Sequence, residues 1–517
     1  MFNYIFFLIL NFKFLTIKSI TNVQFDNNDL NRIEDYLYDP DLSEICYEYI
    51  YNIIKSCLYT SKISSNKPDY NIFYMKDYSD LKLNQVFLNK TGDTSNVNKA
   101  EKKGLNSAIL VSKFSSSIIF NSTIKTNGIG AHSIFSSGET SFVKIYNSSL
   151  ITYQKNSKGL VSKSSSLIKA DDVEIITTGD NSAILFCDNA EITCLNSTLT
   201  TIGKNSPIIF SKGVVSIEQV IASALHSQII LIKNKNSVYV KDSKLFCGAD
   251  GNTDSNIDYA GIFIYDSPFV NNQDTYNYFV AYNSSFTVLP GINYDDVYNK
   301  TSMFSVVNTN ANITLLGKNN FTFGSKNFLN INNPYDDSKN YTGFYNTKVF
   351  LYLKEENIKG NIICGQHCNL NIYLTKNSTL KGSLIIKNGG EINLYIDSTS
   401  TFNLTNNSNI NKLYYEENEN INKKNFELNN YEKEQFNFSK IIFPNITSLN
   451  KIKEDVKCNK TKPIISNKEN NDDSNSEDSS TNIEKNINNN DNNNQNNAKY
   501  FNFKFLKLLF IILIEYI

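Results

Sequence analysis

The sequence predicts an all-β chain folded as a right-handed parallel β-helix, with a small N-terminal helical cap and a disordered C-terminal stalk. Three observations support this fold class. Short apolar runs recur at a nearly constant spacing, a second set of repeats keeps strict register around a tyrosine, and turns rich in Ser, Asn, Gly and Asp separate the runs. Such long-range periodicity is typical of solenoids, whose coils bury their apolar sides only against neighbouring coils.

The first repeat is marked by serines that each precede a short apolar run, at spacings of 21 to 26 residues. These are Ser107, Ser133, Ser157, Ser182, Ser206 and Ser227. The runs, such as AILF and IIF, are short and lead into alternating apolar and polar stretches, which favours strands over helices. A repeat of this length with two or three strands matches one coil of a parallel β-helix.

The second repeat consists of KVFLYL, LNIYLT and EINLYI, which place Tyr352, Tyr373 and Tyr395 at spacings of 21 and 22 residues. Aliphatic residues recur in step with them, at Leu351, Ile372 and Leu394. Because strand side chains alternate faces, the two columns point opposite ways. We expect the aliphatic column inside and the tyrosine column exposed, either as a binding ladder or as stacked rings that stabilise the sheet.

Composition shifts divide the chain into six expected segments. These are a signal peptide at 1–19, a helical N-terminal cap at 20–66, a parallel β-helix at 67–412, a C-terminal cap or mixed region at 413–465, an Asn-rich disordered stalk at 466–498 and a hydrophobic tail at 499–517. In the N-terminal cap, Asp39 is placed to cap a helix that has Pro40 at its first position.

The two ends of the chain suggest display outside the cell. The apolar start favours a signal peptide over a short membrane anchor. The hydrophobic tail follows a polar spacer with small residues, as in a glycosylphosphatidylinositol signal; an amphipathic segment packed on the solenoid is the alternative. We expect a secreted or outer-surface protein that contacts a membrane only through such a lipid anchor.

Eight cysteines suit an oxidising compartment. In CGQHC, Cys364 and Cys368 can close a small disulfide loop, whereas a metal site would need about four ligands. Cys46 and Cys57 would lie about 16 Å apart on the expected helix, too far for a bridge. The sequence has many N-x-S/T acceptors for N-glycosylation, including Asn89, Asn121, Asn147, Asn196, Asn283, Asn377 and Asn445.

Five segments follow one another in order: KTGDTS at 90–95, GLNSAIL at 104–110, GAHSIFSSG at 130–138, NSPIIFSKG at 205–213 and VNTNANITL at 307–315. Together they resemble large extracellular pectin-lyase-like β-helix proteins of the adhesin-like kind. The resemblance covers roughly residues 85–405. It implies the β-helix fold and no established reaction.

No catalytic residue, cofactor or metal site is nominated from the sequence. A pectate-lyase-like site typically needs acidic residues that hold calcium and a strong base, but the one arginine, Arg32, precedes the repeats. Asp171 and Asp172 are the best carboxylate pair for a hydrolase, and turn chemistry is the competing interpretation. His132 and His226 are interpreted as turn residues.

The sequence therefore favours a non-enzymatic, adhesin-like surface protein whose partner is an extracellular glycan or a neighbouring surface protein. A net charge of -1 gives no basic surface for nucleic acid, so no such partner is expected. Two alternatives stay open: a polysaccharide lyase or hydrolase acting on pectin-like polymers, and a purely structural surface coat.

Overall fold

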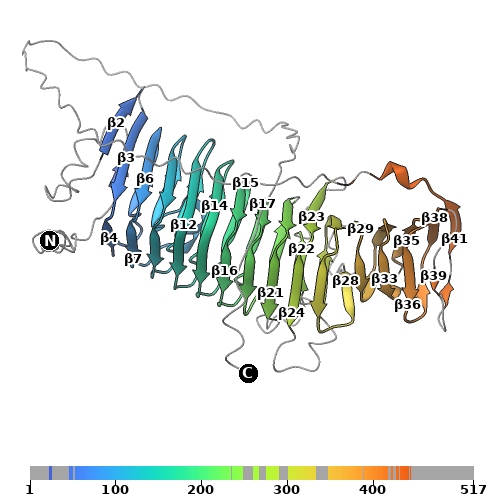
Figure 1. Cartoon of the computed structure of the whole chain (residues 1–517). Coiled ribbons are helices and arrows are strands. Elements are labelled where there is room, and N and C mark those ends of the chain that lie inside the picture. Colours follow the sequence, from blue (N-terminus) through green and yellow to red (C-terminus); the bar gives the residue numbers. More distant parts are fainter. Residues whose placement is uncertain are drawn as a thin grey trace, which may run out of the picture.

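The chain is a parallel β-helix whose strands stack in sequence order along one axis (Figure 1). The computed structural model describes residues 23–25, 46–50 and 53–443, apart from internal gaps at 235, 249–259, 267–274, 290–300, 333–346, 388, 417–420, 423–426, 430 and 442. The predicted all-β parallel β-helix is confirmed.

Each coil has three sides, as the coil that starts at β13 (Leu160–Lys163) shows. This short strand forms the first side, and β14 (Leu167–Thr177) bends in its middle to form the second and third sides. β14 pairs in parallel with β12 (Phe142–Thr152) on the preceding coil. On the following coil it pairs with β15 (Leu185–Leu195) and β16 (Thr198–Thr201). The strands of an inner coil therefore pair with strands of both neighbouring coils.

The tyrosine-containing repeats form one such column on the second side. β29 (Thr347–Lys354), β32 (Cys368–Thr375) and β35 (Glu391–Ile396) pair in parallel, in the register that the sequence predicts. Leu351, Ile372 and Leu394 stack in the core with no exposed surface. The register prediction is confirmed.

The corner between the second and third sides explains the Asn-Ser pairs of the sequence. Its first residue has a positive φ of 45° to 54° on seven coils, at Asn121, Asn147, Asp172, Asn196, Gln219, Asp242 and Asn283. Asn and Asp tolerate this left-handed conformation better than bulky residues do. The next residue points inward, and where it is a serine its hydroxyl accepts a hydrogen bond from a backbone N–H of the coil before. Thus the N–H of Val220 donates to Oγ of Ser243 at 3.1 Å, and the N–H of Ser122 to Oγ of Ser148 at 3.0 Å.

Over the described residues from 46 to 59, the predicted N-terminal helix is wrong. β2 (Cys46–Ile50) and β3 (Ile53–Tyr59) form an antiparallel pair, and β3 continues in parallel onto β6 (Ser79–Asn84). The Tyr and Ile residues of this stretch suit strands, and pairing satisfies the open edge of the first coil. The register places Cys46 opposite Cys57, so the separation expected on a helix does not apply.

The solenoid also begins and ends outside the predicted limits. β1 (Val23–Phe25) pairs in parallel with β5 (Phe73–Met75), and β4 (Lys62–Ser65) pairs with β7 (Phe87–Lys90). At the other end, β38 (Lys412–Tyr415) pairs in parallel with β35 and then with β41 (Glu432–Gln435). These two strands lie in the segment expected as a cap or mixed region, and they continue the β-helix.

The expected signal peptide, stalk and hydrophobic tail lie outside the described residues, as does Arg32. Within the described ranges, no helix is long and apolar enough to cross a membrane.

Candidate functional site

The first side of the solenoid carries an apolar column on its outer face. In-register pairing aligns Tyr74, Leu110, Phe135, Val161, Phe186, Phe210, Leu231 and Phe263. They alternate with the inward aliphatics of the same strands, so they face away from the core. An outward apolar column is unusual, because the outer face of a sheet is normally polar.

A short helix covers the N-terminal part of this column. α3 (Val97–Lys103) starts at Asn96, whose side chain accepts the N–H of Lys99, and ends at Gly104 with φ of 69°. Gly104 lies against the ring of Phe135, where a Cβ atom would come within 2.6 Å of ring carbons. Phe135, Leu110 and Val161 are consequently buried as a small cluster of their own.

Beyond α3 the column forms the floor of a groove of about 650 Å³. Phe186 of β15, Phe210 of β17 (Ile209–Glu218), Leu231 of β19 (Ile230–Lys233), and Phe263 and Tyr265 of β22 (Ala260–Tyr265) line it. The rings of Phe186 and Phe210 meet edge to face at 5.2 Å, and those of Phe263 and Tyr265 stack at 4.8 Å. One rim carries amide side chains from successive turns, at Asn156, Asn181 and Asn205.

Lysines surround the aromatic floor. Lys158, Lys163 and Lys212 place Nζ at 5.1, 6.0 and 5.9 Å from the ring centre of Phe186. Lys212 also lies 5.5 Å from the ring of Phe210, and Lys233 lies 5.1 Å from that of Tyr265. Such cation–π contacts hold ammonium groups beside the floor.

These lysines differ in their carboxylate partners. Lys158 pairs with Glu101 of α3 at 2.6 Å, and Lys163 pairs with Asp188 at 3.0 Å. Burial lowers the pKa of Lys158, which Glu101 opposes. Among the described residues, Lys212 and Lys233 have no carboxylate partner. Lys212, which lines the groove, and Lys233, which lies beside Tyr265 of its floor, are therefore available to pair with an added anion.

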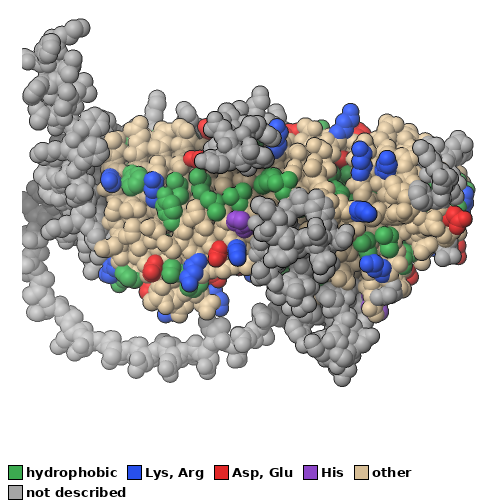
Figure 2. Space-filling view, turned by 90° about the horizontal axis from the view of Figure 1, so that it is seen from below, with side chains coloured by type: hydrophobic (Ala, Val, Ile, Leu, Met, Phe, Trp, Pro, Cys, Tyr) green, Lys and Arg blue, Asp and Glu red, His purple; other side chains and the backbone are tan. Residues whose placement is uncertain are grey.

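The groove contains little that could support hydrolysis. Glu101 is the one acidic residue among the described residues that line it, and it already binds Lys158. No group of three or more His, Cys, Asp or Glu side chains within the described part of the chain could hold a metal ion. On the face shown in Figure 2, charges of both signs are interspersed around a row of hydrophobic side chains.

The tyrosine column is outward-facing but not exposed, which corrects the sequence-based expectation. Tyr352, Tyr373 and Tyr395 stack with ring centres 4.6 and 4.2 Å apart, and Tyr414 continues the stack at 4.2 Å. Tyr373 and Tyr395 are each 9% exposed. Because the ring faces contact each other, they are not free to stack on a sugar. The column stabilises the sheet.

The segment after β41 covers this column. Phe436 packs against Tyr395 at 4.9 Å and Tyr414 at 6.0 Å, and Phe443 lies 6.3 Å from Tyr352. Figure 1 shows the orange-red segment passing back above β35. Burial, together with the neighbouring Tyr414, raises the pKa of Tyr395 to about 12.

The acidic pair and His132 have structural roles. Asp172 occupies the positive-φ corner, and Oδ1 of the buried Asp171 accepts Nδ2 of Asn196 at 2.6 Å, so this pair belongs to a turn. His132 is fully buried, its Nδ1 accepts the N–H of Lys158 at 3.0 Å, and burial lowers its pKa well below the usual value. His226 lies on another coil, with β13, β15 and β17 between the two histidines.

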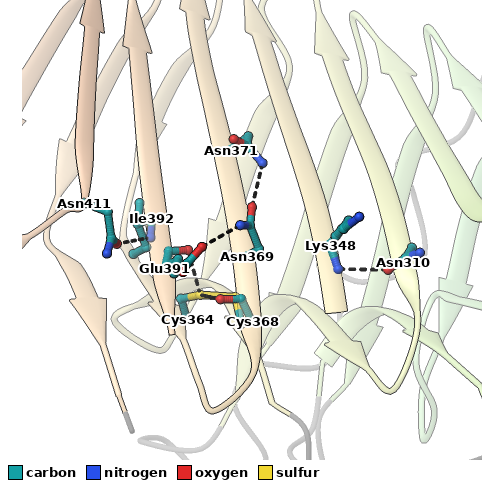
Figure 3. The surroundings of a disulfide bond; sticks show 9 residues. All are labelled: Asn310, Lys348, Cys364, Cys368, Asn369, Asn371, Glu391, Ile392 and Asn411. Atoms are coloured by element: carbon teal, nitrogen blue, oxygen red, sulfur yellow. Dashed lines mark hydrogen bonds between the residues drawn. A yellow bond between two sulfur atoms is a disulfide. The ribbon is translucent and has the colours of Figure 1, made fainter. Parts of the chain in front are cut away.

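A disulfide joins Cys364 and Cys368, whose Cα atoms are 5.7 Å apart (Figure 3). It closes the turn between β31 (Asn361–Cys364) and β32. Beside it, Nδ2 of Asn369 donates to Glu391 at 2.7 Å. The disulfide thus links the two ends of this turn. The free cysteines among the described residues, Cys187, Cys194 and Cys247, are buried.

Sequence reasoning missed the groove, although its signal was present. Phe186, Phe210 and Leu231 are the last residues of the runs AILF, IIF and IIL, and each follows an inward Leu or Ile. Read with the period of a strand, these residues point outward. Comparison with known proteins adds no assignment, because the sequence matches no family model and no curated protein.

Proposed function

We propose that the chain is a non-enzymatic extracellular β-helix protein whose groove binds an acidic glycan. The observation that carries the proposal is the aromatic floor of Phe186, Phe210, Phe263 and Tyr265, with the uncompensated cations Lys212 and Lys233 beside it.

Each part of the groove matches a part of such a ligand. The C–H faces of a sugar ring pack on aromatic side chains, which supply apolar area with few rotatable bonds. Lysine ammonium groups pair with carboxylate or sulfate groups. The amides of Asn156, Asn181 and Asn205 repeat once per coil along the rim, so they can meet hydroxyls of successive sugars in an extended chain.

Binding is better supported than cleavage. A glycoside hydrolase uses two carboxylates that flank the bond, whereas the described lining of the groove offers Glu101 alone, in an ion pair with Lys158. A lyase or hydrolase is therefore the less favoured function. A structural coat needs no such groove.

Display outside the cell is part of the proposal. Three features support it: the apolar N-terminal segment, the polar stalk before a hydrophobic tail, and the disulfide between Cys364 and Cys368. The resemblance to extracellular adhesin-like β-helix proteins points the same way.

A glycan array that contains matched acidic and neutral polysaccharides tests the proposal. The purified chain is expected to bind uronate- or sulfate-bearing polymers and to lose this binding as salt rises, since the pairing is ionic. Binding to neutral polymers alone would contradict the acidic ligand. Self-association without glycan binding would favour the structural coat.

A further inference from the structure

Five sequon asparagines lie on one corner of the solenoid. Asn121, Asn147, Asn196, Asn283 and Asn377 all occupy the turn between the second and third sides, with φ between 47° and 62°. Other sequons of the described residues, such as Asn89, Asn312, Asn320 and Asn403, lie within strands instead, and Asn445 is outside the described residues. We propose that N-linked glycans are attached in single file along this corner. The inference rests on the proposed export but not on the identity of the groove's ligand.

The local geometry presents each acceptor to solvent. Asn121, Asn147, Asn283 and Asn377 are exposed, and Asn196 is half-buried. The serine that follows each asparagine points into the core, so the hydroxyl residue two positions on points outward again. In the first sequon, Ser122 is buried and Thr123 is on the outside of β10 (Thr123–Thr126). The asparagine and the hydroxyl of each sequon therefore lie together on the outer surface.

The hydrogen bonds of the corner are compatible with a glycan. Nδ2 of Asn283 donates to Asp242 on the preceding coil at 2.7 Å, and Nδ2 of Asn147 donates to Asn121 at 2.5 Å. The amide nitrogen of asparagine has two hydrogens. Attachment of a sugar replaces one of them, and the other remains available to donate along the corner.

The corner lies away from the groove. The groove is on the first side, and in a three-sided coil the corner between the second and third sides is opposite that first side. Glycans in this row would leave the aromatic floor at Phe186 and Phe210 open. The register thus places the five corner sequons on the side of the solenoid opposite the groove.

Glycopeptide mapping of the full chain, expressed in a eukaryotic cell line and collected from the medium, tests the row. We expect glycans on at least three of the five corner asparagines. A chain that carries glycans on two or fewer of them, or that stays inside the cell without glycans, would overturn the inference. Replacement of the outward hydroxyl residues, for example Thr198→Ala and Ser285→Ala, removes a glycan while the corner asparagine is retained.

A matched control places a glycan on the groove. Ala183→Ser completes a sequon at Asn181, which lines the rim. If the geometry is right, a glycan at Asn181 abolishes binding of polygalacturonate, and removal of the corner glycans leaves that binding within twofold of wild type. Loss of binding on removal of the corner glycans would contradict the placement of the row. A secreted chain that carries no corner glycans but binds polygalacturonate would refute the glycan row, and the proposed function would stand.

Discussion

The carboxylate of Glu356 accepts both the backbone N–H and the side-chain amide of Asn319, at 3.1 and 2.6 Å, inside the core of the solenoid. It occupies the inward position that serine holds on most other coils, and it is 1% exposed. Burial raises its pKa to about 7, although the bonds from Asn319 act in the opposite direction.

This pKa predicts a loss of stability as pH rises. The folded chain holds the proton up to about pH 7, whereas the unfolded chain releases it near 4.5. Between these values the folded state binds more protons, so the stabilisation present below about pH 4.5 is lost towards pH 7. The shift corresponds to at most about 3 kcal/mol. Glu356→Gln should raise the melting temperature at pH 8 and reduce its pH dependence, and Glu139→Gln, at an exposed position on another coil, serves as the control. An equal pH dependence in Glu356→Gln would contradict the assignment.

The inward-facing serines should contribute more to the stability of the fold than the outward-facing ones. In Ser243→Ala, the buried N–H of Val220 loses its acceptor, which costs about 1–3 kcal/mol. Ser223→Ala removes a half-buried outward hydroxyl and should cost under about 0.5 kcal/mol. Thermal melts of the two variants give the comparison. Similar losses of stability would show that the hydrogen bonds of the inward serines contribute little.

The segment after β41, which covers the tyrosine column, should protect the last coils from hydrogen exchange. Phe436→Ala removes ring contacts with Tyr395 and Tyr414, and about 0.5–1.5 kcal/mol per aromatic pair is lost. Because a solenoid is stabilised by nearest neighbours, hydrogen exchange should quicken in β35 and β38 and stay unchanged in β12 and β14. Phe114→Ala, at an exposed ring on an early coil, is the control. Unchanged exchange in β35 would mean that the segment does not hold the tyrosine column.

The chain is expected not to cleave polygalacturonate, with or without calcium. The groove lacks a second carboxylate among its described lining residues, and Glu101 is engaged by Lys158. Incubation of the purified protein should give neither the ultraviolet absorbance of unsaturated products nor new reducing ends. Either signal, if lost in Glu101→Gln, would favour the enzyme alternative.

The strand register was predictable because like residues stack in a solenoid. The spacings between Leu351, Ile372 and Leu394 therefore equal the lengths of successive coils. The first strands were not, because Cys46–Ile50 and Ile53–Tyr59 belong to no repeat and also suit a helix. The burial of Tyr373 depends on Phe436, which comes from a segment with no detectable period. Predicting the groove requires two facts: that Phe186 and Phe210 point outward, and where α3 ends. The strand period of the sequence shows only the first.

Titration of the purified chain with oligogalacturonate at low and high salt tests the central claim most directly. The wild-type protein should bind, and Phe210→Ala and the pair Lys212→Gln with Lys233→Gln should each bind at least tenfold more weakly, which corresponds to about 1.4 kcal/mol. Lys125→Gln is the matched control, because Lys125 lies 5.9 Å from the ring of Phe87 on another side of the solenoid. Unchanged affinity in the groove variants, or no binding by the wild-type protein to any acidic glycan, would contradict the account.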